Sequence, residues 1–200
     1  MIGPASRALP VMLAGIAVAG CGQHPGGQAA AASAAKTAGP GITVQEYMEQ
    51  QINPAAEYSF RSVRDVADEK GRRLEQPRTS AEWKEVEAKL EVLQGAPTIL
   101  TAANLRVAPP NFRSENPAVE SEPAAIQAAI DKDRGDFDRR AYRLQVSATE
   151  ALLAARARDA VGMVKTLEAV DRACESCHLR YFYPGDARAQ QAAREAYIMN

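Results

Sequence analysis

The stretch 159-DAVGMVKTLEAVDRACESCHLRYFYPGD-186 decides the fold of this chain. The residues within it that recur at intervals of three and four are Val164, Leu167, Val170, Cys174, His178 and Tyr181. This spacing places side chains on one face of an α-helix. Asp159 is a suitable N-cap, and the helix is expected to end before Pro184. The sequence therefore predicts a long helix whose core-facing stripe carries Cys174 and His178.

Three further runs repeat apolar residues at the same helical spacing: 43–66, 79–100 and 137–155. Thr79 and Glu82 have the spacing of a capping box at the start of the second run. Pro54 and Pro97 are expected to bend the first and second runs. Together with the final helix, these runs predict an all-α fold, an antiparallel four-helix bundle that occupies residues 43–200.

The segments between the runs complete this expected fold. The proline-rich stretch 106–123 predicts a loop that covers one end of the bundle. PAAIQAAIDKDRG, residues 123–135, predicts a short helix with Pro123 in its first turn and Gly135 at its end. No stretch alternates apolar and polar residues between turns, so no sheet is expected. Three arginines of the third run are interpreted as part of a solvated face: Arg139, Arg140 and Arg143.

Composition agrees with a helical domain and limits its partners. The chain has 200 residues, and its 24 Lys and Arg are balanced by 25 Asp and Glu. Such a balance creates no strong field that would attract nucleic acid, so none is expected as a partner. Aromatic residues make up only 6% of the chain, and the common residues favour helix.

The N-terminus has the features of an export signal. The apolar run 8-ALPVMLAGIAVAG-20 is too short to span a bilayer but has the length of a signal-peptide core. Its end, Val18-Ala19-Gly20-Cys21, resembles the lipobox of bacterial lipoproteins. This resemblance implies a signal peptide at 1–20, lipidation of Cys21 and a periplasmic domain anchored to a bacterial membrane. The alternative is an ordinary signal peptide cut near the same place, with Cys21 unmodified.

Residues 21–42 are predicted to be a flexible linker. They are rich in Gly, Pro, Ala and Ser and have few large apolar side chains, so they bury too little surface to offset the entropy of ordering. His24 lies in this linker and is interpreted as a solvated residue with no role as a ligand.

Four kinds of site are built from residues like those of the pentapeptide 174-CESCH-178. A thioredoxin-type pair sits at a helix N-terminus after a strand, whereas this pair lies inside a helix. Structural zinc needs four ligands, and the predicted domain offers only Cys174, Cys177 and His178. A disulfide between the two cysteines would be strained in a helix. Cys-x-x-Cys-His is instead the attachment sequence of c-type haem.

The sequence ACESCHLRYFYP, residues 173–184, resembles the haem site of the cytochrome c prime group, the class II c-type cytochromes. ITVQEYMEQQINPAAEY, residues 42–58, resembles the first helix of its periplasmic and lipoprotein members. The resemblance covers residues 43 to about 184 and implies an up-down-up-down bundle. It also implies one haem c held covalently by Cys174 and Cys177, with His178 as proximal ligand. Members often have a basic residue four positions after the histidine, where this chain has Phe182.

The candidates for a distal ligand are methionines, because His178 is the one histidine of the predicted domain. Three methionines lie in the predicted signal or in the C-terminal segment after Pro184: Met1, Met12 and Met199. Met163 shares a helix with His178, and fifteen residues of helix separate them by roughly 22 Å. Met48 remains, since the start of the first helix lies level with the end of the last in such a bundle. The alternative is that Met48 packs above a five-coordinate iron.

Two functions follow from these alternatives. A haem with His178 and Met48 as axial ligands suits periplasmic electron transfer between redox partner proteins. A five-coordinate haem would bind nitric oxide or carbon monoxide, so the protein would be a gas binder or sensor. A helical lipoprotein without haem is the third alternative. No second cofactor motif is present, so the protein is not expected to be an enzyme, and homodimerisation is left open.

Overall fold

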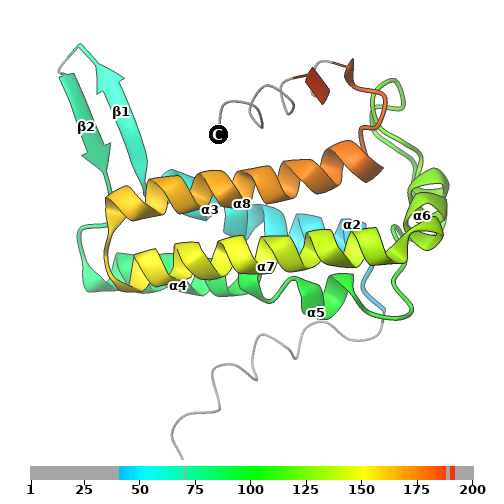
Figure 1. Cartoon of the computed structure of the whole chain (residues 1–200), viewed down its shortest axis with the longest axis horizontal. Coiled ribbons are helices and arrows are strands. Elements are labelled where there is room, and N and C mark those ends of the chain that lie inside the picture. Colours follow the sequence, from blue (N-terminus) through cyan, green and yellow to red (C-terminus); the bar gives the residue numbers. More distant parts are fainter. Residues whose placement is uncertain (1–40, 70, 188–189, 192–200) are drawn as a thin grey trace, which may run out of the picture. The chain divides into compact units, whose positions relative to one another are not determined.

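The computed structural model describes residues 41–69, 71–187 and 190–191 (Figure 1). The predicted signal peptide, 1–20, lies outside the described residues, as does nearly all of the predicted linker. Three single residues of the sequence analysis also lie outside them: Cys21, His24 and Met199.

The described part of the chain is mostly helical, which confirms the predicted all-α class. The elements in chain order are α2 (Val44–Tyr47), the π-helix η1 (Met48–Ile52), α3 (Asn53–Ser62), β1 (Arg64–Asp68), β2 (Gly71–Glu75), α4 (Ser80–Gln94), α5 (Pro97–Leu100), α6 (Pro123–Lys132), α7 (Arg134–Arg156) and α8 (Ala160–Tyr181). The helices pack in order, with α3 against α4, α4 against α7 and α7 against α8.

The prediction that the chain has no sheet was wrong. Strands β1 and β2 pair antiparallel, with Arg64 opposite Glu75 and Asp68 opposite Gly71. The hairpin extends away from the helices (Figure 1), and most of its side chains are exposed. Its stabilising contacts are ion pairs such as Arg64 to Glu75, at 2.6 Å, so it shows no alternation of apolar and polar residues. Val66, which was expected on the first helix, lies in this hairpin.

The first helical run contains a π turn that the sequence analysis missed. Pro54 has no N–H, and its ring would clash with the carbonyl of Gln50 in a regular α-helix. The chain widens just before the proline, and the Asn53 N–H donates to the Met48 carbonyl five residues earlier. The predicted bend at Pro54 is thus a π turn from Met48 to Ile52. Turns of this kind are frequent at functional sites.

Two helix N-caps form where the sequence predicts them. Thr79 and Glu82 form the capping box at the start of α4, with the Glu82 N–H donating to the Thr79 hydroxyl at 3.2 Å. The Asp159 side chain accepts from the Gly162 N–H at 2.9 Å and caps α8. The expected kink at Pro97 is a break, because Pro97 begins the separate short helix α5.

The expected end of the short helix at Gly135 was wrong. Helix α6 ends at Lys132, and Gly135 lies in the first turn of α7. The cause is a second cap: the Asp133 side chain accepts from the Asp136 N–H at 3.0 Å and starts α7 there. Gly135 therefore lies within α7 and does not end α6.

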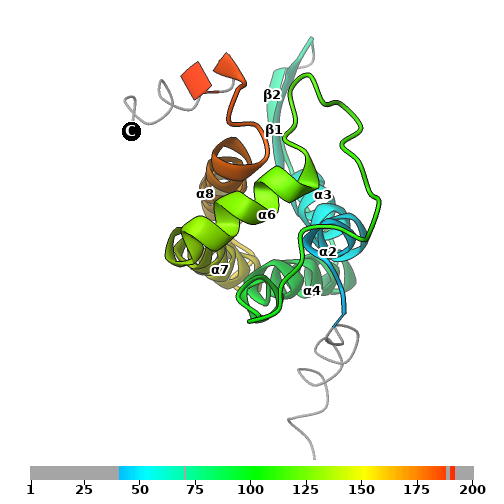
Figure 2. The same ribbon diagram turned by 90° about the vertical axis from the view of Figure 1, so that its right-hand side faces the viewer.

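The loop between α5 and α6 covers one end of the helices, as predicted. The Val44 N–H donates to the Arg106 carbonyl at 2.9 Å, and the Ser121 N–H donates to the Phe182 carbonyl at 2.8 Å. The loop therefore joins the start of α2 to the end of α8, and α6 lies across this end (Figure 2). Met163 is fully buried in the core, which confirms its predicted packing role.

Candidate functional site

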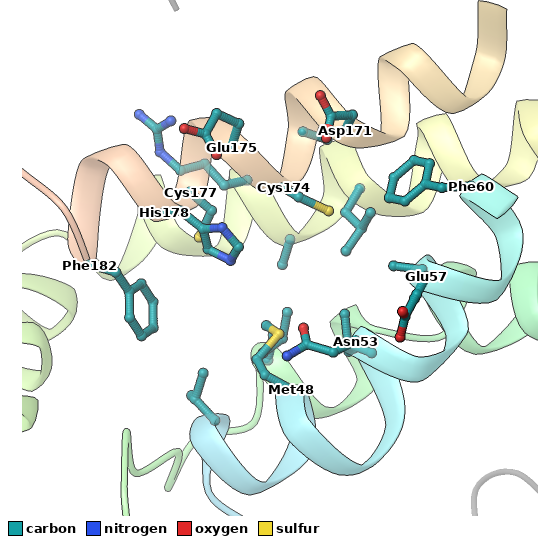
Figure 3. A pocket seen from close by; sticks show the side chains of 18 of the residues that line it. Met48, Asn53, Glu57, Phe60, Asp171, Cys174, Glu175, Cys177, His178 and Phe182 are labelled. Atoms are coloured by element: carbon teal, nitrogen blue, oxygen red, sulfur yellow. The ribbon is translucent and has the colours of Figure 1, made fainter. Parts of the chain in front are cut away.

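A cavity of about 470 Å³ lies between the α2–α3 segment and α8, and α7 also contributes to its wall. Its volume is within the range of roughly 300–1,000 Å³ that is usual for small-molecule and cofactor sites. Cys174, Cys177 and His178 line it from α8, and Met48 lines it from the opposite side (Figure 3). The structure thus brings together the four residues that the sequence analysis selected within the domain.

The walls of this cavity are mainly apolar. Their large apolar residues include Val44, Ile52, Phe60, Leu100, Leu144 and Phe182. Charged side chains also line it, with Glu57 and Arg61 on α3 and with Asp171 and Glu175 on α8. The cavity therefore suits a flat, largely apolar group that also carries polar substituents.

Cys174 and Cys177 are free thiols that are partly buried beside the cavity. Burial raises the pKa of Cys174 to about 11 and that of Cys177 to about 12. Both sulfurs are therefore protonated near neutral pH, whereas a thiol-exchange site needs a lowered pKa. This environment adds a physical argument against the thioredoxin alternative.

The imidazole of His178 has no hydrogen-bond partner within the described ranges. Its ring makes edge contacts with the rings of Phe182, at 5.8 Å, and Tyr183, at 6.0 Å, measured between ring centres. Burial lowers the pKa of His178, against the opposing charges of Glu175 and Asp171. The ring is therefore neutral near pH 7, and neutral imidazole is the form that binds a metal ion.

The residues around His178 were compared with the ligand sets that proteins use for metal ions. Among the residues that the structure describes, no group of three or more His, Cys, Asp and Glu side chains is arranged to hold a metal ion. Structural zinc normally has four such ligands.

Met48 lies in the first turn of the π-helix, and its side chain points into the cavity toward α8 (Figure 3). The amide of Asn53 lies beside it and also lines the cavity. The sequence analysis did not select Asn53, although its place five residues after Met48, directly before Pro54, could have drawn attention to it. Met48 and His178 therefore occupy opposite walls of one cavity.

A cluster of charged residues fixes α7 to the end of α8, and the sequence analysis missed it. Arg140 was interpreted as solvated, but its side chain is only 19% exposed. Its Nε donates to Asp136 at 2.8 Å, and its Nη1 donates to the Ser176 carbonyl, inside the CESCH segment, at 2.7 Å. The hydroxyl of the buried Tyr181 also donates to Asp136, at 3.0 Å. Arg140 therefore positions the turn that carries Cys177 and His178.

Replacing Asp136 with asparagine is expected to destabilise the protein by about 2 kcal/mol. The reason is that the hydrogen bonds from Arg140 and Tyr181 to its charged carboxylate are weakened. The free energy of unfolding is measured by urea denaturation, followed by circular dichroism. Asp138→Asn is the matched control. Asp138 pairs with Arg134 on the same helix, at 2.7 Å, and is more exposed than Asp136. An i,i+4 pair of this kind contributes at most about 1 kcal/mol.

The same pair of variants has a defined pH dependence. The hydrogen bond from Arg140 is the main cause that holds the pKa of Asp136 below its usual value, and Tyr181 and Arg139 act in the same direction. A lowered pKa stabilises the fold above the unfolded value of about 4 and loses this effect as the pH falls below it. The difference between wild type and Asp136→Asn should therefore shrink in acid. Equal losses for both variants at pH 7 would show that Asp136 has no special role.

Comparison with family models, with curated proteins and with solved structures found no match for this chain. Within the described ranges, no helix has both the length and the apolar character needed to cross a bilayer.

Proposed function

We propose that this chain is a monohaem c-type cytochrome of the cytochrome c prime kind that acts in periplasmic electron transfer. The observation that carries the proposal is the position of Cys174, Cys177 and His178 on one apolar cavity. The two thiols would hold the haem c covalently, and the imidazole of His178 would be the proximal ligand. Two observations support this assignment: within the described ranges the imidazole of His178 has no hydrogen-bond partner, and the cavity has a volume of about 470 Å³.

The proposed fold is an antiparallel four-helix bundle with its haem near the C-terminal end of the last helix. Its four members would be the α2–α3 segment, α4, α7 and α8. The packing of α3 on α4, of α4 on α7 and of α7 on α8 supports this arrangement, as does the view along the helices (Figure 2). The β1–β2 hairpin and the short helices α5 and α6 would be additions to the bundle.

Each residue of the cavity has a separate task in this proposal. Haem bound there would supply a one-electron couple between ferric and ferrous iron. Met48 would be the distal ligand and would close that face to external ligands. Arg140 holds the CESCH turn through the Ser176 carbonyl, and the apolar walls exclude water. Since the sequence has no second cofactor motif, we propose an electron carrier and not an enzyme.

The test of the proposal is haem staining of the purified protein after denaturing electrophoresis. Covalent haem stays with the protein band, whereas haem held only by axial ligands leaves it. A band without colour would contradict the proposal and favour a helical lipoprotein without haem.

We further propose that the protein is lipidated on Cys21 and anchored to a bacterial membrane, with its domain in the periplasm. The sequence Val18-Ala19-Gly20-Cys21 supports this assignment. Labelled palmitate should enter the wild type and should be absent from Cys21→Ala, because the acyl chains are attached at that cysteine. An unlabelled, soluble wild-type protein would refute the lipid anchor. For a domain in the periplasm, the proposed partners are periplasmic redox proteins.

Gas binding is the second candidate function, and the apolar surroundings of Met48 favour it. If the Met48 sulfur does not bind the iron, the distal side is bordered by Val44, Ile52 and the amide of Asn53. Such a pocket would admit nitric oxide or carbon monoxide. Whether the Met48 sulfur binds the iron therefore decides between electron transfer and gas binding.

A further inference from the structure

The π turn places the side chain of Asn53 beside Met48 on the wall of the cavity. In a regular α-helix, five residues turn the chain through roughly 500°, so Asn53 would lie about 140° around the helix from Met48. In this structure the Asn53 N–H donates to the Met48 carbonyl, so one wider turn separates the two residues. Both side chains line the cavity, and the amide of Asn53 lies beside the Met48 side chain (Figure 3). The π turn therefore adds an amide to the surroundings of Met48.

The side-chain amide of Asn53 has no hydrogen-bond partner within the residues that the structure describes. The other two polar side chains that line the cavity from α3, Glu57 and Arg61, pair with each other at 2.6 Å. The rest of this wall is apolar apart from the Met48 sulfur, and its members are Val44, Ile52, Ala56 and Phe60. An amide at an apolar surface is costly once water is excluded, unless another group accepts its hydrogen bond. Haem that fills the cavity would exclude water, so the Asn53 amide then needs an acceptor.

We propose that Asn53 is a positioning residue whose side-chain N–H donates a hydrogen bond to the Met48 sulfur when that sulfur binds the iron. The inference rests on the proposed function, because it requires haem with Met48 as its distal ligand. A thioether sulfur is a weak acceptor, and hydrogen bonds to the ligands of a haem iron help to set its potential. The bond withdraws electron density from the sulfur, which favours ferrous over ferric iron. Asn53 therefore raises the reduction potential through Met48.

The first test is the reduction potential of the purified holoprotein, measured by spectroelectrochemical titration. Asn53→Leu keeps a similar side-chain volume but removes the donor, so the reduction equilibrium should shift about threefold toward ferric iron, the effect of one weak hydrogen bond. This shift is about 28 mV for one electron, since tenfold corresponds to about 59 mV. The methionine charge-transfer band should remain but change in energy. Gln50→Leu is the matched control, because Gln50 is an exposed amide of the same π-helix that does not line the cavity.

The second test is a double-mutant cycle that separates an effect through Met48 from a direct effect on the haem. In the Met48→Leu background the iron has no sulfur ligand. Replacing Asn53 with leucine in that background should therefore leave the potential unchanged, as Gln50→Leu should in the wild type. A side chain that contacts the haem itself, such as a donor to a propionate, would shift the potential equally in both backgrounds.

The possible outcomes distinguish this inference from the proposed function. The inference alone is overturned by a wild type with the methionine band whose potential does not change in Asn53→Leu. Equal shifts in the two backgrounds also overturn it, because Asn53 would then act without Met48. A wild type that lacks haem or the methionine band contradicts the proposed electron carrier, and the inference with it.

Discussion

Replacing both Cys174 and Cys177 with alanine is expected to remove all haem colour from the protein band after denaturing electrophoresis. Each thiol would form one thioether bond to the haem, so the double variant retains no covalent link. His178 remains in place, and haem bound through an axial ligand alone is lost when the chain unfolds. The measurement therefore separates covalent attachment from binding in the cavity.

Cys21→Ala is the matched control, because the chain has three cysteines and Cys21 is the one outside the domain. This variant should keep the full haem stain while it loses the lipid label. Colour that persists in the double variant would show that the haem is attached elsewhere. Equal loss in Cys21→Ala would show that export or maturation, and not the thioether bonds, had failed.

The double variant should also be less stable than the wild type. In the proposed holoprotein, haem fills the cavity of about 470 Å³ and joins α8 to its surroundings. A ligand that binds only the folded state stabilises that state, and its loss removes this contribution. The helical signal should therefore disappear at a lower urea concentration.

The long helices were predictable because their apolar residues repeat without interruption. In α8, Leu167 and Val170 lie in the core, and Asp159 provides an unambiguous cap. The same periodicity placed the cavity-lining residues Cys174 and His178 on one side of that helix. Met48 was placed opposite them by matching the levels of the first and last helices.

The hairpin and the π turn depend on features that an apolar pattern does not contain. Most side chains of strand β1 are charged. Its pairing with β2 is supported by ion pairs such as Arg64 to Glu75. The π turn depends on the missing N–H of Pro54, which the sequence shows only as a generic bend. The π turn also shapes the site, because it carries Met48.

The position of Arg140 shows why charged residues are difficult to interpret from spacing alone. Arg140 directly precedes the buried Ala141, at the boundary between the apolar and the solvated face of α7. Its neighbour Arg143 is exposed, and within the described ranges it has no ion pair. Arg140 is largely withdrawn from solvent because Asp136 and the Ser176 carbonyl accept its hydrogen bonds. Those partners become neighbours only when α7 packs on α8.

Replacing Met48 with alanine is expected to convert the iron from a low-spin to a high-spin form. The wild type should show the charge-transfer band of a methionine sulfur bound to ferric iron, and the variant should lose it. The physical reason is the position of Met48 on the wall opposite His178, with its side chain directed into the cavity (Figure 3). The reduced variant should bind carbon monoxide about 100-fold more tightly, the factor for a wild type whose open form is about 1% populated.

Met48→Leu separates ligation from packing, because leucine keeps the apolar volume and removes the sulfur. If the sulfur binds the iron, Met48→Leu should match Met48→Ala in spin state. Met163→Ala is a further control, since Met163 is fully buried in the core and its loss should cost about 2–5 kcal/mol of stability without a change in the spectrum. A wild type that is already high-spin and binds carbon monoxide would make Met48 a packing residue. The apolar wall around Val44 and Ile52 would then border an open distal face, and gas binding would replace electron transfer as the function that the site supports best.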